Sequence, residues 1–138
     1  YLIPIGQAKI VQEGSDVTIV SYGKMMKVII DAQKKLNDEN IFPELIDLRT
    51  LRPIDYDLII ESVKKTNRLI IVEESWPLAS ISSEISYKIQ KDAFDFLDAP
   101  IQRICSADTP MAYSPTLVKE FLPSANDVIE KTKAIMYL

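Results

Sequence analysis

Runs of apolar residues separated by short polar loops divide the chain into alternating strands and helices. Two β-rich runs come first, at residues 8–12 and 17–22, on either side of a short turn that contains Gly14. Such a pair is typical of a β-hairpin. Three more strands are predicted at residues 45–49, 69–72 and 101–105. The wholly apolar, β-branched run at 69–72 is typical of a strand buried on both faces of a sheet.

Between the strands, apolar residues recur at steps of three and four, which is the period of an amphipathic helix. A first helix is predicted after Gly23, and Asp55 is a suitable N-cap for a second. Ser124 and Asp127 have the spacing of a capping box for the last helix. The residues expected to face the core from the four longer helices are Met25, Val28, Ile29, Ala32 and Leu36, then Leu58, Ile59, Ser62 and Val63, then Ile81, Ile85 and Ile89, then Val128, Thr132 and Ile135. A short helix is predicted near 117–121.

Strands that alternate with helices favour a parallel sheet covered on both faces. The predicted fold class is α/β: three layers, α/β/α, around a mixed, mostly parallel five-stranded sheet whose first strand is antiparallel. The 138 residues fit a single domain. No repeat or linker interrupts residues 1–138, so one domain is expected over that whole range.

Composition and charge exclude several classes of function. The net charge of −4 disfavours nucleic acid and anionic membrane as main partners. One cysteine excludes an internal disulfide and favours a reducing compartment. The absence of histidine removes the usual catalytic triads and zinc sites, and the three glycines form no dinucleotide or phosphate loop. The N-terminus lacks an initiator Met and a basic signal-peptide region, so we expect it to continue a longer chain.

Sites in open parallel sheets lie beyond the carboxyl ends of the strands. Glu73 and Glu74 are neighbours at one such end, and because neighbouring side chains point to opposite faces, we expect a capped, solvated strand end rather than an acid–base pair. Arg49 and Arg52 suit a clamp for a phosphate or carboxylate ligand. The alternative is an ion pair with Asp47 or Asp55, and we favour it because arginine pairs readily with carboxylates.

Three other features of the sequence are candidates for binding or reactivity. Ser80, Ser82 and Ser83 open a helix whose free N–H groups suit an anion, although small residues for close packing explain them better. Cys105 is expected to be a buried, unreactive thiol. Trp76 fits an interface anchor and a core residue equally well.

A further polar feature is acidic. Asp92, Asp95 and Asp98 are spaced by three, which places them close together if the helix extends that far. The carboxylate of Leu138 adds a negative charge that folding can bring nearby. Such a patch suits docking of a basic module, although exposed charges are most often only solvated.

Several segments together resemble one known family. They lie, in order, at residues 3–10, 20–23, 46–55 (IDLRTLRPID), 62–68, 72–77 (VEESWP), 83–85, 96–100 (FLDAP) and 107–111. The chain resembles, over essentially all its length, the C-terminal domain of the β subunit of pyruvate dehydrogenase, the thiamine-diphosphate-dependent decarboxylating component. Relatives often have glycines where this chain has Ser80 and Ser82, so local packing is expected to differ there.

The resemblance implies a transketolase C-terminal-type fold and a role in an oxidoreductase multienzyme complex that feeds glycolytic pyruvate into acetyl-CoA. The implied partners are the α subunit, a second β subunit in an α₂β₂ heterotetramer, and the peripheral subunit-binding domain of dihydrolipoyl acetyltransferase. Asp98 and Leu138 are the implied acyltransferase-docking residues, with Asp95 as an extension. Thiamine diphosphate and Mg²⁺ are expected in the parent enzyme and not in this fragment, which has no implied catalytic, cofactor or metal residue.

The parent enzyme converts pyruvate and lipoamide to acetyl-lipoamide and CO₂, and the isolated domain is expected to be inactive. The implied location is the bacterial cytoplasm or, in a eukaryote, the mitochondrial matrix. Two alternatives stay open. One is a free-standing α/β protein that binds a small anion at Arg49 and Arg52, and the other is the equivalent domain of a branched-chain 2-oxoacid dehydrogenase or a transketolase.

Overall fold

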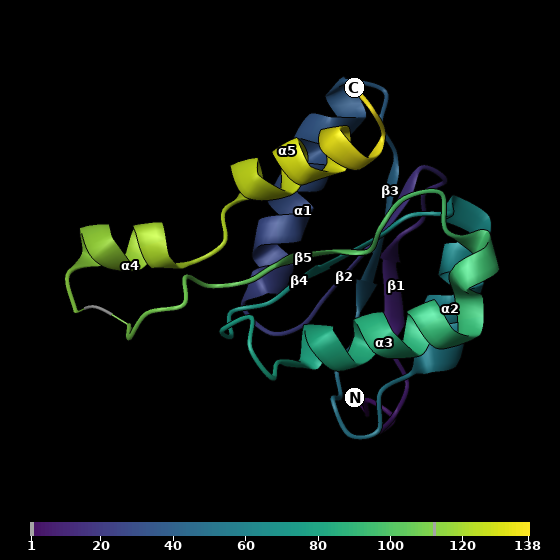
Figure 1. Ribbon diagram of the computed structural model, residues 1–138, viewed down its shortest axis with the longest axis horizontal. Coiled ribbons are helices and arrows are strands. Elements are labelled where there is room, and N and C mark those ends of the chain that lie inside the picture. Colours follow the sequence, from purple (N-terminus) through teal and green to yellow (C-terminus); the bar gives the residue numbers. More distant parts are fainter. Residues whose placement is uncertain (1, 112) are drawn as a thin grey trace.

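A computed structural model describes residues 2–111 and 113–138 of the chain (Figure 1). Its strands are β1 (Lys9–Gln12), β2 (Val17–Ser21), β3 (Pro43–Asp47), β4 (Leu69–Val72) and β5 (Gln102–Ile104). Its helices are α1 (Met25–Asp38), α2 (Tyr56–Thr66), α3 (Ile81–Ala93), the 3₁₀ turn η1 (Phe94–Phe96), α4 (Pro115–Phe121) and α5 (Ala125–Ile135).

The strands form one five-stranded sheet in the order β1-β3-β2-β4-β5. β2 pairs in parallel with β3 and β4, β4 pairs in parallel with β5, and β1 alone is antiparallel, against β3. The predicted fold class is therefore confirmed. Because four strands run the same way, their carboxyl ends share one edge of the sheet, called here the carboxyl edge, and the opposite edge is the amino edge.

The predicted β-hairpin is wrong, because β1 pairs with β3 rather than with β2. The loop between β1 and β2 crosses the start of β3, where the N–H groups of Ser15 and Asp16 both donate to the carbonyl of Phe42, at 2.9 and 3.1 Å. Gly14 lies directly against that backbone, since a Cβ there would be 2.3 Å from the carbonyl carbon of Pro43. The crossing is therefore a tertiary contact that only a glycine permits.

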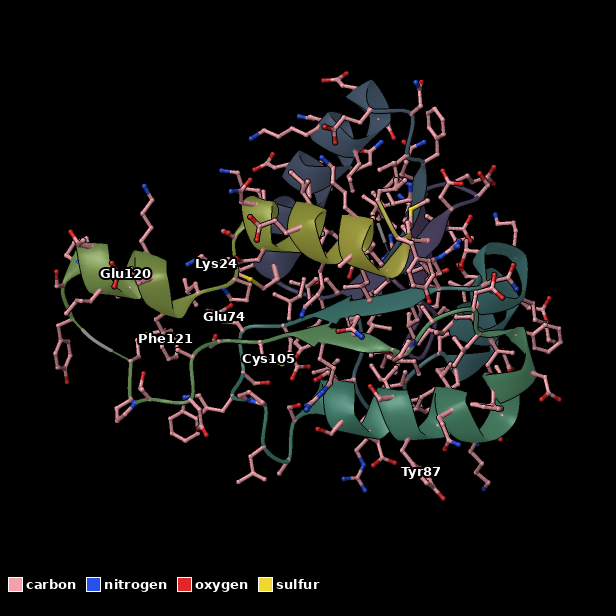
Figure 2. The ribbon with its side chains drawn as sticks, turned by 45° about the horizontal axis from the view of Figure 1, so that its top comes forward. Lys24, Glu74, Tyr87, Cys105, Glu120 and Phe121 are labelled. Atoms are coloured by element: carbon pink, nitrogen blue, oxygen red, sulfur yellow. The ribbon has the colours of Figure 1, made fainter. Side chains whose placement is uncertain are left out.

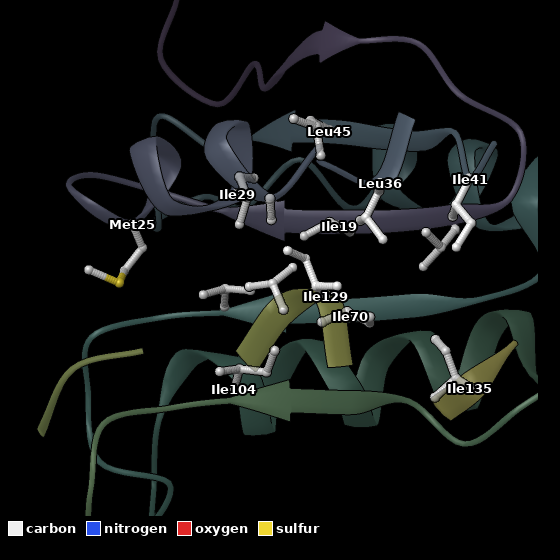
Figure 3. Packing of buried hydrophobic residues seen from close by; sticks show 14 of the residues in the cluster. Ile19, Met25, Ile29, Leu36, Ile41, Leu45, Ile70, Ile104, Ile129 and Ile135 are labelled. Carbon is white, nitrogen blue, oxygen red and sulfur yellow. The ribbon is translucent and has the colours of Figure 1, made fainter. Parts of the chain in front are cut away.

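Helices cover both faces of the sheet, as predicted. α1 and α5 pack on one face around Ile19, Leu45 and Ile70, and Figure 3 shows this cluster from close by. α2 and α3 pack on the other face around Ile46 and Ile71. β2 and β4 lie in the middle of the sheet and are buried throughout.

The predicted helix caps are confirmed at two places. The Asp55 carboxylate accepts from the N–H of Leu58 at 3.2 Å, and Ser124 and Asp127 form the full capping box at the start of α5. α4 projects from the carboxyl edge, away from the sheet and its other helices (Figure 1). No helix within the described ranges is long and apolar enough to cross a membrane.

Candidate docking surface

Asp98 and the last turn of the chain lie close together at the amino edge. The N–H of Asp98 donates to the carbonyl of Asn67 at 2.8 Å. The next residue, Arg68, donates from Nε to the carbonyl of Ile135 at 3.3 Å. Asn67 and Arg68 thus bridge the two predicted docking segments, and both Asp98 and Leu138 are exposed, the latter at 76%.

The turn that carries Asp98 is fixed by the end of α2. Asn67 caps that helix in the left-handed conformation, at φ 64°, which asparagine tolerates better than most residues. Its side-chain amide donates to the carbonyl of Phe96 at 2.8 Å. With the Asp98 N–H bond, Asn67 therefore holds both sides of Leu97.

The three aspartates do not form one helical stripe. α3 ends at Ala93 and the 3₁₀ turn η1 follows, so the helix does not extend through Asp95 and Asp98. Asp92 is paired with Lys88 of its own helix at 2.9 Å. Asp95 and Asp98 are exposed and make no ion pair with any other described residue. Of the three aspartates, only Asp95 and Asp98 are thus left to contribute to the predicted acidic surface.

An open, mostly apolar groove of about 630 Å³ lies next to Asp98. Its lining comes from the outer side of α3 and from the segment that leads to β5: Ser86, Tyr87, Gln90, Phe94, Leu97, Asp98, Ala99, Pro100 and Ile101. The Ser86 hydroxyl is buried and has no hydrogen-bond partner among the described residues. Tyr87 points away from the body of the domain (Figure 2).

The sequence analysis did not identify this groove. The sequence feature that indicates the groove is the pair Tyr87 and Phe94. These residues are seven positions apart, so they lie on one side of a helix. That side is opposite to Ile85 and Ile89, which are completely buried. Two large aromatic side chains on a predicted solvent face were thus the available clue.

Glu73 is completely buried at the carboxyl end of β4, so the expected solvated strand end is wrong for this residue. Its carboxylate accepts from the N–H of Ser82 at 2.9 Å, from the hydroxyl of Ser82 at 3.2 Å, from the hydroxyl of Ser75, and from the Tyr22 hydroxyl at 3.4 Å. Glu74 is only partly buried, so the two neighbours do point to different environments, as predicted.

The burial of this network raises the pKa of two nearby side chains, Tyr22 and Cys105. Desolvation, with the Glu73 charge as the next cause, raises the pKa of Tyr22 to about 12. Desolvation also raises the pKa of the Cys105 thiol, which lies 3.6 Å from the Ser82 hydroxyl. Both groups are therefore protonated at neutral pH. The raised pKa makes Cys105 a weak nucleophile, as predicted, but the residue follows the end of β5 and is only partly buried, so the expected full burial is wrong.

The serine segment does not offer an open anion site. The Ser82 N–H in the first turn of α3 is used by the chain's own Glu73 carboxylate. From the other side, the guanidinium of Arg103 donates to the carbonyl of Pro77 and to the Ser83 hydroxyl, each at 2.8 Å. Ser80 has φ −90°, so its backbone does not require a glycine, and its hydroxyl joins the same network.

The expected ion pairs of Arg49 and Arg52 are absent from the described part of the chain. The candidate acids are already used for backbone groups. Asp47 accepts from the N–H of Arg49 itself at 3.0 Å, and Asp55 accepts from the N–H of Ala8 at 3.0 Å and caps α2. Arg49 and Arg52 lie in the loop that follows the carboxyl end of β3, and neither guanidinium group has a carboxylate partner among the described residues.

Trp76 is not a core residue. Its side chain is 49% exposed, and its indole N–H donates to the carbonyl of Thr109 at 2.9 Å. The contact ties the loop after β4 to the segment that leads to α4. Because about half of this large apolar side chain is exposed to solvent, the interpretation of Trp76 as an interface anchor is favoured.

No group of three or more acidic or cysteine side chains within residues 2–111 and 113–138 is placed to hold a metal ion.

Comparisons with known proteins give a consistent result. The family described as "Transketolase, C-terminal domain" matches residues 6–128. The "Pyruvate dehydrogenase E1 component subunit beta" of Rickettsia felis is 51% identical over 135 residues, which are 98% of this chain and 41% of that protein. The mitochondrial protein of the same description from Dictyostelium discoideum is 44% identical over 135 residues, covering 98% of this chain and 38% of its own length.

Among solved structures, one titled "Split gene transketolase, inactive beta4 tetramer" superposes with a TM-score of 0.86 at 25% identity. The superposition covers 99% of this chain and 44% of the other. The chain thus spans about two fifths of the length of the proteins it matches.

Proposed function

The chain belongs to the transketolase C-terminal domain family, and from this premise we propose that it is the C-terminal assembly and docking domain of a pyruvate dehydrogenase β subunit. The relatives from both a bacterium and a mitochondrion carry that β-subunit description. In the proposed role, the domain joins an α₂β₂ enzyme and binds the peripheral subunit-binding domain of dihydrolipoyl acetyltransferase. The corresponding location is the cytoplasm of a bacterium or the mitochondrial matrix.

One observation carries the docking part of the proposal. Asp98 lies on the rim of the apolar groove and at the same edge as the last turn of the chain. Exposed carboxylates beside apolar surface suit a basic, amphipathic partner, because the charges steer the encounter and the apolar contact holds the complex. Asp95 lies three residues earlier, in η1, and would add a second exposed negative charge.

The chemistry of the parent enzyme belongs elsewhere in this proposal. Thiamine diphosphate and Mg²⁺ would be bound by other domains of the assembly, in keeping with the lack of histidine and of a glycine-rich phosphate loop in this sequence. We expect the isolated chain to release no CO₂ from pyruvate. Turnover by this chain without an α subunit would contradict that assignment.

The test is a calorimetric titration of the chain with the peripheral subunit-binding domain of the cognate acetyltransferase. We expect binding that weakens as salt rises, because exposed charges are screened. Asp98→Ala should weaken binding by about tenfold, the effect of losing about 1.4 kcal/mol, and Asp95→Ala should weaken it less.

The matched control is Asp31→Ala, which removes an equal charge from an exposed position on α1. It should leave the affinity within about twofold. If Asp98→Ala and Asp31→Ala have the same effect, or if the folded chain does not bind the module at all, the docking role is wrong for this surface.

A further inference from the structure

Two successive residues, Asn67 and Arg68, connect segments of the amino edge that are far apart in the sequence. The Asn67 side chain bonds to Phe96, which is 29 residues away, and the Arg68 Nε bonds to Ile135, which is 67 residues away. A cap that merely ends a helix satisfies the carbonyl groups of that helix. These two side chains instead reach both segments of the predicted docking surface, the turn that carries Asp98 and the last turn of the chain.

The backbone of both residues is fixed by α2 and by the sheet. The N–H of Asn67 donates to the carbonyl of Val63 at 2.8 Å, which ends α2. The carbonyl of Arg68 accepts from the N–H of Thr18 at 2.8 Å and from the hydroxyl of Thr66 at 3.1 Å. Because Thr18 belongs to β2 in the middle of the sheet, the two residues have a set position relative to the core.

The end of α2 holds the turn that carries Asp98 at three points. The Asn67 amide donates to the carbonyl of Phe96, and the Asn67 carbonyl accepts from the N–H of Asp98, each at 2.8 Å. Three residues earlier on α2, the Lys64 ammonium lies 5.5 Å from the centre of the Phe96 ring, within the range of a cation–π contact. The end of α2 therefore sets the place from which the Asp98 carboxylate projects.

Arg68 holds the other segment by capping α5. Ile135 is the last residue of that helix, and the last carbonyl groups of a helix have no partner within it. The Arg68 guanidinium supplies a donor together with a positive charge, which the negative end of the helix dipole favours. Its Nη1 also donates to the carbonyl of Asp16 at 3.3 Å, in the loop before β2. The last turn of the chain is thus placed relative to the end of α2.

We propose that Asn67 and Arg68 are the positioning residues of the docking surface, which keep Asp98 and the last turn of the chain at a fixed separation. The role rests on the proposed function and requires neither residue to touch the partner. A surface made of two segments binds one folded module well when both are presented together, because ordering them during binding costs free energy. Loosening either bond should therefore lower the affinity although both partner-facing groups are still present.

The charges of the two residues separate positioning from simple electrostatics. Asn67→Asp adds a negative charge and Arg68→Gln removes a positive one, so electrostatics alone would make a basic module bind both variants more tightly. Positioning has the opposite effect. In Asn67→Asp a carboxylate oxygen replaces the donor that faces the Phe96 carbonyl. In Arg68→Gln the shorter side chain no longer reaches both of its carbonyl partners.

The test is a calorimetric titration of these variants with the peripheral subunit-binding domain. We expect each to weaken binding by about threefold or more, the size of effect that neighbouring residues have on one another. Should Arg68→Gln fail to fold, Arg68→Lys replaces it, since lysine keeps the charge but lacks the forked donors, and a weakening of about twofold or more is expected.

A double-variant cycle measures whether Asp98 depends on Asn67. Asn67→Gly keeps the left-handed backbone but lacks the side-chain amide. In that background Asp98→Ala should weaken binding by less than about threefold, compared with about tenfold in the unsubstituted chain. Ser124→Ala is the control, because it removes the cap at the opposite end of α5. It should leave the affinity and the effect of Asp98→Ala unchanged.

Hydrogen exchange in the free chain reports on the same bonds without the partner. The N–H of Asp98 is bonded to the Asn67 carbonyl at 2.8 Å, and the N–H of Leu138 to the carbonyl of Lys133 at 2.9 Å. Asn67→Gly should speed exchange at Asp98, and Arg68→Gln should speed exchange at Leu138, each by about tenfold or more. Urea unfolding of the same variants shows how much of each increase comes from unfolding of the whole chain.

Three results would overturn the inference. One is unchanged or tighter binding by Asn67→Asp and Arg68→Gln, another is a full effect of Asp98→Ala in the Asn67→Gly background, and the third is exchange that the substitutions do not change. Failure of the proposed function is distinguishable, because the unsubstituted chain then does not bind the module or is insensitive to Asp98→Ala. In that case the positioning role is wrong as well.

Discussion

The backbone N–H of Ser82 donates to the carboxylate of Glu73 across 2.9 Å, which fastens the first turn of α3 to the end of β4. The N-terminus of a helix carries unpaired N–H groups and a partial positive charge. A carboxylate placed there is stabilised even when it is completely buried. Glu73 is such a carboxylate, because it is completely buried. This hydrogen bond helps to fix the start of α3 at this position. It also provides the acceptor that an external anion would otherwise supply to the Ser82 N–H.

Glu73→Ala should lower the free energy of unfolding by about 2–4 kcal/mol, because it leaves the Ser82 N–H and the neighbouring hydroxyls without their acceptor. Urea unfolding followed by circular dichroism measures the change. Glu74→Ala, at the partly buried neighbouring position, is the control and should cost no more than about 0.5 kcal/mol. Equal losses from the two substitutions would show that the buried carboxylate is not an anchor.

Tyr22 should make the fold sensitive to alkali. Its pKa rises from 10.0 to about 12 on folding, so the folded chain keeps this proton longer than the unfolded chain. The stabilisation is therefore complete below pH 10 and is lost as pH rises towards 12. In urea unfolding measured across that range, Tyr22→Phe should show a shallower decline of stability than the unsubstituted chain. Parallel declines would contradict this prediction.

Gly14→Ala should destabilise the fold by about 1–3 kcal/mol, since its Cβ would overlap the backbone of Pro43 and force β1 away from β3. Gly23→Ala is a matched comparison, because Gly23 has φ +61° but open space around its Cα. That substitution should cost about 1 kcal/mol through backbone strain alone. Thermal unfolding of both variants separates the two causes, and a smaller loss at Gly14 than at Gly23 would refute the crowded crossing.

Ser124→Ala should cost about 1 kcal/mol, because Ser124 accepts from the N–H of Asp127 in the capping box of α5. Ser114 precedes α4 in the same way but its side chain makes no capping bond. Ser114→Ala should therefore leave the unfolding midpoint in urea unchanged. A comparable shift for both serines would mean that the capping hydrogen bond contributes nothing.

The periodicity of apolar residues was sufficient for the elements and their packing faces. The strand at Leu69–Val72 and the caps at Asp55 and Ser124 are where the pattern placed them. These features depend on neighbours within a few residues, so their signal is contained in a short stretch of sequence. Asp98 was singled out by the spacing of three aspartates and then by a likeness to a known family, and its role in docking stays a prediction.

Contacts between distant residues had no local signal. From the sequence, Gly14 is predicted to lie in a hairpin turn. In the structure it packs against the backbone of Pro43, and β1 pairs with β3 instead of β2. From the sequence, Glu73 is predicted to be a solvated strand end. In the structure it is buried against the N-terminus of α3, whose contacting residue, Ser82, comes nine residues later. The sequence by itself determined the strands, helices and layers, because these follow from local period and capping. Only the tertiary structure decided the partner of β1, the burial of Glu73 and the position of Asp98 beside the last turn, because each depends on chain segments that meet only after folding.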